Sequence, residues 1–250
     1  MKAIKKIHPV IILGLLFIVP SYAAAQTALP KISIGVDTSN NPAEIVGTLQ
    51  ILFLITILTL APSIIMMMTS FTRIIIVFHF LRQSLATQSV PSNQILVGLA
   101  LFITFFIMKP ALIKINDTAL QPYIRKEISQ KEALTNASIP IKAFMLKQTR
   151  KKDIKLFIDL RGGDKPKSIA DISLEILIPA FIISELKTAF QIGFLLYLPM
   201  LLIDLVVGSV LLSMGMMMLP PVMIAMPFKL LLFVLVDGWY LIVESLVKGF

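Results

Sequence analysis

The sequence predicts an all-α membrane protein made of helical hairpins, whose apolar helices are interrupted by charges and prolines. Of its 250 residues, 57% are hydrophobic and 15% are charged, whereas a soluble domain is about 45–50% apolar and about 25% charged. The stretch 45–68 is almost wholly apolar and is long enough to cross a bilayer. The composition argues against a water-soluble enzyme and favours burial of the excess apolar residues in lipid or against other chains.

The first 25 residues have the pattern of a cleavable signal peptide. Three lysines precede the apolar run Val10–Val19, which is followed by a proline and three alanines. A helix as short as this run covers only about half of a ~30 Å hydrocarbon core, which favours a signal peptide over a membrane anchor. The three alanines are small residues that a signal peptidase accepts, so we expect cleavage between Ala25 and Gln26. Residues 26–44 would then form a short extracytoplasmic leader.

Residues 45–108 are expected to form the first apolar hairpin. Its first span is residues 45–68, and its return span is residues 91–108. The segment between them, Thr72–Pro91, contains basic residues and no acid. We interpret this segment as a short cytoplasmic turn that follows the positive-inside rule.

Residues 109–171 are the polar part of the chain, with 14 basic and 7 acidic residues. Prolines divide them into short pieces typical of amphipathic helices. The positive charge alone favours the cytoplasm, but a signal peptide would place the segment outside, and loops near ~60 residues cross largely regardless of charge. We therefore expect an extracytoplasmic, periplasmic helical loop. Arg150–Lys152 has no interleaved aromatic residues, so we interpret it as a solvated helix face rather than a phosphate or nucleic-acid site.

Residues 172–250 are expected to form a second apolar hairpin that is broken by charges and prolines, the prolines standing at positions 179, 199, 220, 221 and 227. A charge at the centre of a bilayer costs about 3 kcal/mol or more when unpaired. Each proline frees a backbone carbonyl that only protein or water can satisfy. These helices are therefore expected to face other protein or an aqueous cavity.

A methionine cluster lies between the last two apolar spans. Its centre is Met216, Met217 and Met218, and its flanking residues are Met214, Gly215, Pro220 and Pro221. The prolines end one helix and begin the next, which places the cluster on a loop, and the glycine permits a turn. Methionine usually fills gaps between helices. The alternative is that a ring of such loops closes a pore as a hydrophobic constriction. Gap filling is the more common role of methionine, but the position of the cluster on a loop makes the two interpretations more nearly equal.

Five charged residues stand within the second hairpin: Glu185, Lys187, Asp204, Lys229 and Asp237. They indicate either a proton relay or ion site, or structural ion pairs within or between chains. The signs nearly balance and no histidine lies beside them, which favours ion pairs. The preferred pair is Glu185 with Lys229.

Nothing in the sequence indicates catalysis, a cofactor or a metal. The chain has no cysteine, and its two histidines, His8 and His79, are too far apart for a histidine-based metal site. No serine has a histidine partner at a plausible depth, which argues against an intramembrane hydrolase. A small-solute or ion transporter and a purely structural anchor remain alternatives.

Two stretches closely resemble the FliP family of flagellar biosynthetic proteins, the export-gate subunits of type III secretion. The first, Leu60–Met108, contains LAPSIIMMMTSFTRIIIVFHFLRQ, and the second, Leu177–Trp239, contains SVLLSMGMMMLPPVMIAMPFKLLLFVLVDGW. Together they cover nearly half the chain, in the order of the family. Ala86 stands where the family has glycine, and Val90–Pro91 where it has two prolines, which affects one turn.

The resemblance implies a core subunit of the flagellar export gate in the bacterial inner membrane, at the basal body. The family assembles as a pentameric ring that winds with FliQ and FliR into a helical pore inside the basal-body ring, displaced outward from the bilayer. FlhA and FlhB would be neighbouring partners, and unfolded rod, hook and filament subunits the passengers. The family's methionine gate corresponds to Met216, Met217 and Met218.

The resemblance also leaves one close alternative, the paralogous export-gate subunit of virulence injectisomes. The signal peptide and the long charged loop favour the flagellar branch. In either branch the energy source lies in other components, in agreement with the lack of a nucleotide-binding motif in this chain.

Overall fold

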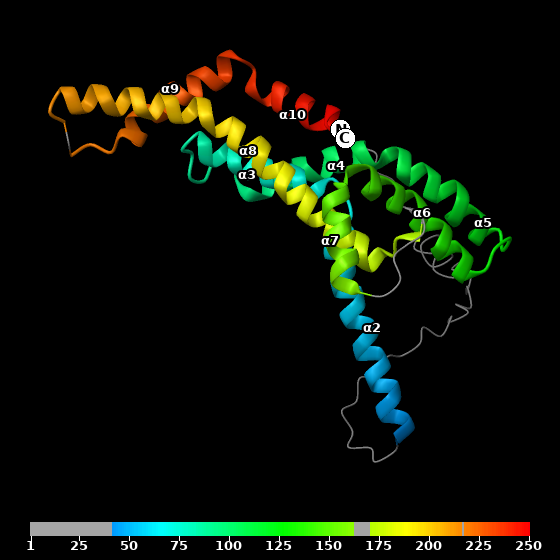
Figure 1. Cartoon of the computed structure of the whole chain (residues 1–250). Coiled ribbons are helices and arrows are strands. Elements are labelled where there is room, and N and C mark those ends of the chain that lie inside the picture. The colour runs from blue at the N-terminus through cyan, green and yellow to red at the C-terminus, as the bar shows by residue number, and fades with distance from the viewer. Residues whose placement is uncertain (1–41, 163–170, 217) are drawn as a thin grey trace, which may run out of the picture. The chain divides into compact units, whose positions relative to one another are not determined.

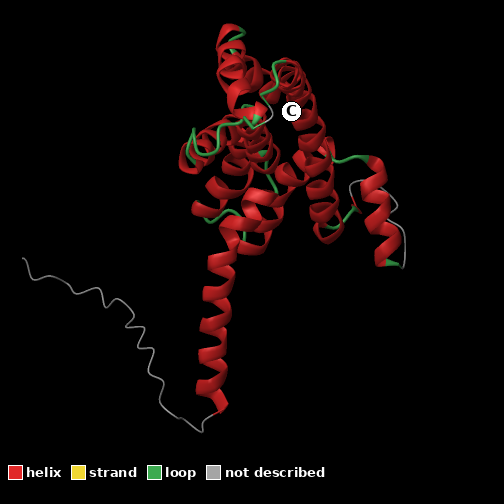
Figure 2. Ribbon diagram, turned by 90° about the vertical axis from the view of Figure 1, so that its left-hand side faces the viewer, coloured by secondary structure: helices red, strands yellow, loops and turns green. Residues whose placement is uncertain are grey.

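A computed structural model describes residues 42–162, 171–216 and 218–250 of the chain (Figure 1). Every regular element in these residues is a helix (Figure 2). The expected cleavage site between Ala25 and Gln26 lies outside them and stays a prediction. The chain divides into two units, residues 1–51 and 52–250. Only the start of the first long helix is described in the first unit, and the packed core lies in the second unit.

The helices in chain order are α2 (Pro42–Met67), α3 (Phe71–Ser84), α4 (Asn93–Ile115), the π-helix η1 (Asn116–Leu120), α5 (Gln121–Ile124), α6 (Gln130–Gln148), α7 (Lys151–Arg161), α8 (Leu174–Ser213), α9 (Pro221–Leu235) and α10 (Gly238–Lys248). Among the described residues, three stretches are long and apolar enough to cross a membrane: Leu49–Met67, Asn93–Ile124 and Leu174–Ser213. The pair α9 and α10, bent by 63°, passes the same test together. The expected all-α membrane class is confirmed.

The prediction that Thr72–Pro91 is a short turn is wrong, whereas its cytoplasmic location stays a prediction. Most of this segment is α3, which packs along α8 and α4. The residues Ile74, Val77, Phe78 and Leu81 recur at helical spacing and are almost completely buried. The real turn is only the short connection from α3 to α4, where Ala86 has a φ of 59°. The basic residues that suggested a turn lie on this packed helix, and Arg73 is buried in it.

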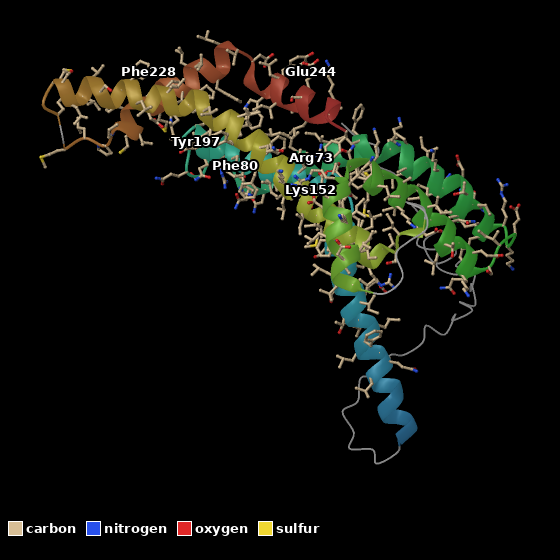
Figure 3. All side chains as sticks on the ribbon, viewed as in Figure 1. Arg73, Phe80, Lys152, Tyr197, Phe228 and Glu244 are labelled. Atoms are coloured by element: carbon tan, nitrogen blue, oxygen red, sulfur yellow. The ribbon has the colours of Figure 1, made fainter. Side chains whose placement is uncertain are left out.

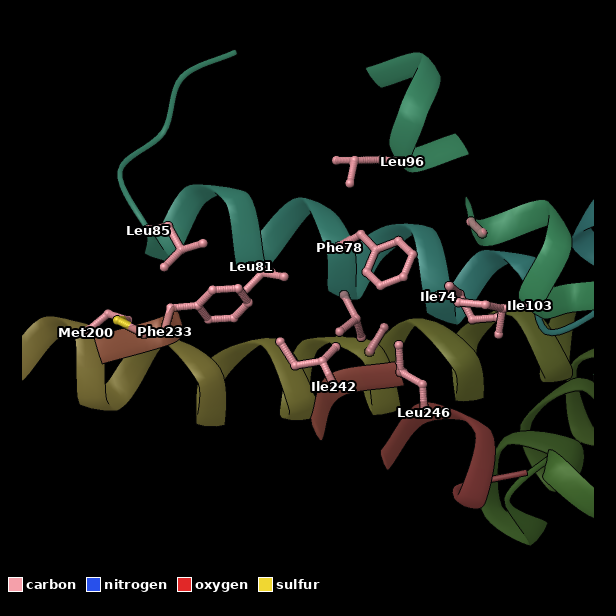
Figure 4. Packing of buried hydrophobic residues seen from close by; sticks show 13 residues of the cluster. Ile74, Phe78, Leu81, Leu85, Leu96, Ile103, Met200, Phe233, Ile242 and Leu246 are labelled. Atoms are coloured by element: carbon pink, nitrogen blue, oxygen red, sulfur yellow. The ribbon is translucent and has the colours of Figure 1, made fainter. Parts of the chain in front are cut away.

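The core of the second unit lies where α3, α4, α8, α9 and α10 meet (Figure 4). Phe78 of α3 packs edge-on against Trp239, which also contacts Phe233 of α9. At the crossing of α3 and α8, a Cβ atom added to Gly193 would lie 2.5 Å from the ring of Phe80. The glycine therefore allows the two helices to approach closely.

The expected breaks in the first half of the second hairpin do not occur. Pro179 and Pro199 lie inside α8, which continues through both for 40 residues. Each proline removes one hydrogen bond of the helix, but α3, α7 and α9 pack along α8 and hold it together. At 1.5 Å per residue, α8 is about 60 Å long, roughly twice a ~30 Å hydrocarbon core.

The polar segment is helical, as predicted, but Pro110 and Pro140 do not divide it, because they lie inside α4 and α6. It comprises the end of α4, then η1, α5, α6 and α7. Ser129 and Glu132 form a reciprocal capping box at the start of α6, and these hydrogen bonds from Ser129 lower the pKa of Glu132 below its ordinary value. A second buried cluster, centred on Met145 and Phe181, joins α6 and α7 to the first turns of α8.

Candidate functional site

The first half of α8 carries a buried ion pair that joins it to α3. The Nε atom of Arg73 donates to Oε2 of Glu185 at 2.8 Å, and Nη2 donates to Oε1 at 2.5 Å. The side chain of Arg73 is 4% exposed and that of Glu185 is 0% exposed. A bidentate pair of this kind fixes both distance and orientation between the two helices.

Arg73 is also held by the ends of two further helices. Its Nη1 donates to the backbone oxygen of Gly249 at 3.0 Å, just after α10, and its Nη2 donates to Oε1 of Gln148 at 3.2 Å, at the end of α6. Its guanidinium carbon lies 3.8 Å from the centre of the Phe250 ring. One buried cation thus connects α3, α6, α8 and the residues after α10 (Figure 3).

A second contact lies directly beside the first on α8 and positions α7. Ser184 donates from Oγ to Oδ2 of Asp153 at 2.5 Å and accepts from the backbone N–H of Arg150 at 3.1 Å. Arg150 donates to the same carboxylate from Nε at 2.8 Å. Adjacent residues of α8 therefore bind α7 on one side and α3 on the other.

The carboxyl group of Asp153 has a pKa below its ordinary value. Burial acts to raise this pKa, but hydrogen bonds from Ser184 and Arg150 and the positive charges of Arg150 and Lys152 outweigh it. Because the folded pKa lies below the unfolded one, the group stabilises the fold fully above the unfolded pKa, and the contribution is lost as pH falls through the folded pKa.

We therefore expect the stability advantage of the natural protein over Asp153→Asn to be constant near neutral pH and to shrink below about pH 4, near the unfolded pKa of Asp. The measurement is the difference in thermal midpoint between the two proteins in detergent at pH 7, 5 and 3. A difference that does not change with pH would show that the charge of Asp153 contributes nothing.

The second half of α8 carries a third buried contact. Lys229 of α9 donates from Nζ to Oδ2 of Asp204 at 2.7 Å and to the backbone oxygen of Ser84 at 3.2 Å. The lysine side chain is 2% exposed and the aspartate is 20% exposed. This contact joins α8, α9 and the end of α3, and the Oδ1 atom of Asp204 accepts no hydrogen bond within the part of the chain that is described.

The expected pair of Glu185 with Lys229 is wrong within the chain. Each has another partner, because α3 lies along α8 with Arg73 at one end and Ser84 at the other. Lys187 and Asp237 form no ion pair among the described residues. Lys187 is exposed on α8, and Asp237, with a φ of 50°, forms the left-handed corner between α9 and α10.

The methionine cluster lies on the loop between α8 and α9, as the prolines predicted. Gly215, with a φ of 74°, ends α8 in a Schellman motif: the N–H of Met216 bonds to the oxygen of Leu211, and that of Gly215 bonds to the oxygen of Leu212. Pro221 is the first residue of α9 and Pro220 its N-cap. The side chains of Met214, Met216 and Met218 are 66%, 40% and 98% exposed, and Met217 lies outside the described residues.

Apolar surface continues from this loop along both neighbouring helices. A groove of about 550 Å³ runs between α8 and α9 and is lined only by aliphatic and aromatic side chains, among them Leu202, Val206 and Phe228. No group of three or more potential metal ligands occurs in the described part of the chain. The arrangement offers packing surfaces and an exposed apolar loop.

Sequence inspection missed Arg73, Ser84, Asp153 and Ser184, although one signal was present. Arg73, Val77, Leu81 and Ser84 recur at helical spacing and therefore share one face of α3. An arginine on the apolar face of an amphipathic helix needs a buried acid, and Glu185 was available. For Asp153 and Ser184 the sequence contains no comparable signal, because their contact depends on how α7 folds back onto α8.

The fold and these contacts define an all-helical membrane protein whose apolar helices are joined by buried charges and leave a methionine loop uncovered. A family model of the FliP family matches residues 54–246. The flagellar biosynthetic protein FliP of Bacillus subtilis (strain 168) is 58% identical over 217 residues, covering 87% of this chain and 98% of that protein. The chain belongs to the FliP family.

Relatives of the same name support this membership. The Aquifex aeolicus (strain VF5) protein is 49% identical, with 89% of this chain and 92% of that protein covered. The Pectobacterium carotovorum subsp. carotovorum protein is 47% identical, with 95% and 91% covered. Family membership implies a component of the flagellar export apparatus.

Proposed function

We propose that this protein is the core subunit of the flagellar type III export gate, several copies of which line a pore for unfolded rod, hook and filament subunits. The observation that carries the proposal is the exposure of the methionine loop. Met218 is 98% exposed and Met216 is 40% exposed on a loop bounded by two apolar helices. Within the described residues of a single chain, these side chains are exposed. They can therefore pack against the same loop of neighbouring copies around a shared axis.

The proposed mechanism is passive gating. Methionine is unbranched and flexible, so loops from several copies can pack into an apolar constriction that excludes water and ions. The same side chains can part around an unfolded polypeptide and close behind it. The Schellman turn at Gly215 and the rigid Pro220–Pro221 pair would hold the ends of the loop while the residues between them move.

The apolar surfaces of α8 and α9 support an assembly of several chains. Exposed large side chains run along the second half of α8, including Leu202, Leu205 and Val206, at 58–65% exposure. At about 60 Å, α8 is too long for one bilayer crossing, so part of it would contact other proteins. In this proposal the neighbours are further copies in a ring, FliQ and FliR, with FlhA, FlhB and the basal-body ring of the inner membrane around them.

Replacing Met216, Met217 and Met218 together by alanine is expected to raise the leak of small ions through the assembled complex. Alanine removes the flexible side chains that fill the constriction but leaves the helices unchanged. Single-channel conductance of the purified complex in planar bilayers measures this leak. The matched control is Met223→Ala, a methionine on α9 that is 70% exposed. Unchanged conductance in a triple variant that still assembles would contradict the gate.

Deleting the gene separates the flagellar role from that of a virulence injectisome. The flagellar role predicts loss of filaments and of swimming, with any effector secretion unchanged. The opposite result would assign the chain to an injectisome.

A further inference from the structure

We propose that the cations at the crossing of α7 and α8, together with the exposed apolar stripe that continues along α8, bind an anionic phospholipid. The headgroup phosphate would lie on Lys152 and Lys187, and an acyl chain would lie along α8. This site shares no residue with the methionine loop.

Three positive side chains lie together at this crossing, where Figure 3 labels Lys152. The hydrogen bonds of Ser184 to Asp153 and Arg150 hold the start of α7, which carries Lys152, against α8, and Lys187 lies one turn of α8 beyond Ser184. Both lysines are exposed. The nearby carboxylate of Asp153 is already used by Arg150 and Ser184. Arg150, Lys152 and Lys187 thus share the single carboxylate of Asp153, so the cluster keeps a net positive charge that a bound phosphate would offset.

Exposed apolar side chains continue from Lys187 along the same face of α8. Phe190, Phe194, Leu198 and Leu201 follow Lys187 at helical spacing, at 55%, 63%, 42% and 40% exposure, and Ile183, at 38%, lies one turn before it. Leu198 lies eleven positions after Lys187, or about 16 Å along the helix, which is half of a ~30 Å hydrocarbon core. The stripe is thus as long as one acyl chain in a single leaflet.

The combination of these two features decides the ligand class. A free phosphate would use the lysines but not the stripe, and a zwitterionic lipid would use the stripe with little gain from the lysines. An acidic protein surface would leave Phe194 and Leu198 exposed. An anionic phospholipid satisfies both features in one molecule. Leu156 and Leu160 follow the lysines on α7 and are also exposed. They would contact the same apolar region of the membrane as the stripe on α8.

The test uses the purified full-length protein in its assembled complex in a neutral detergent, titrated with phosphatidylglycerol and separately with phosphatidylcholine, with bound lipid counted by native mass spectrometry. A lysine near an anionic headgroup contributes about 1 kcal/mol, so removing two is expected to weaken phosphatidylglycerol binding by about thirtyfold. We expect this loss in the double variant Lys152→Gln/Lys187→Gln, with phosphatidylcholine binding unchanged. The matched control, Lys126→Gln/Lys131→Gln in the α5–α6 region, should bind like the natural protein.

Two further measurements keep the proposal testable if the double variant does not assemble. Raising the salt concentration should weaken phosphatidylglycerol binding to the natural complex, and Phe194→Asn should weaken binding of both lipids. Equal affinity for the two lipids, or no loss in an assembled Lys152→Gln/Lys187→Gln variant, would overturn the proposal. Displacement of phosphatidylglycerol by inorganic phosphate at similar concentration would also overturn it and would assign the cluster to a soluble anion.

Discussion

Replacing Glu185 by leucine is expected to destabilise the protein by about 3–5 kcal/mol, the usual cost of removing one partner from a buried ion pair. The guanidinium of Arg73 would keep its contacts to Gly249 and Gln148 but would lose both hydrogen bonds to the carboxylate. The single tryptophan, Trp239, packs against Phe78 and Phe233 in the core. Its fluorescence during chemical unfolding in detergent measures the loss.

The double variant Arg73→Leu/Glu185→Leu is the control for this prediction. It removes both charges and leaves neither unpaired, so it is expected to be clearly more stable than Glu185→Leu. A double variant as unstable as the sum of the two single variants would mean that Arg73 acts through its contacts to Gly249, Gln148 and Phe250 rather than through Glu185.

Replacing Asp204 by leucine is expected to cost about 3 kcal/mol or more, and replacing Lys229 by methionine is expected to cost less. The reason is the unequal burial of the pair. Lys229 is 2% exposed and would keep only the backbone oxygen of Ser84, whereas Asp204 is 20% exposed, so water can replace its lost partner. Unfolding of the two variants, followed by the fluorescence of Trp239, gives the order.

The surface pair of Lys248 with Glu244 is the matched control. It is also a lysine–carboxylate pair on the second hairpin, but its side chains are 74% and 34% exposed. Lys248→Met is expected to change stability by no more than about 0.5 kcal/mol. If Lys229→Met proves more damaging than Asp204→Leu, the burial of the lysine is not what determines the energy of the contact.

The fold class could be predicted from the sequence because it depends on the length and apolar character of each stretch, which the composition and the residue spacing show directly. Long apolar stretches predicted α2, α4 and α8, and the proline pair predicted the loop before α9. The same method misinterpreted α3, because the absence of acids between Thr72 and Pro91 was treated as a sign of topology. The buried face of α3, from Arg73 to Ser84, shows that this segment packs against neighbouring helices.

The sequence indicated that the charged residues of the second hairpin would form ion pairs, but it did not indicate which residues would pair. Unpaired charges are costly among apolar helices, so ion pairs were expected. Which acid meets which base depends on the positions of α3 and α7 along α8, and no local pattern contains that information. Pro179 and Pro199 likewise suggested breaks, but tertiary packing kept α8 continuous.

The central claim is that methionine loops of several copies meet on one axis. The chain has no cysteine, so Met218→Cys introduces a single thiol, which can form a disulfide only with a copy whose Cα lies within about 7 Å. Mild oxidation of the complex in membranes is predicted to give covalent dimers for Met218→Cys and none for Leu160→Cys, an exposed position on α7. If the Met218→Cys variant assembles but yields only monomers after oxidation, the claim is contradicted.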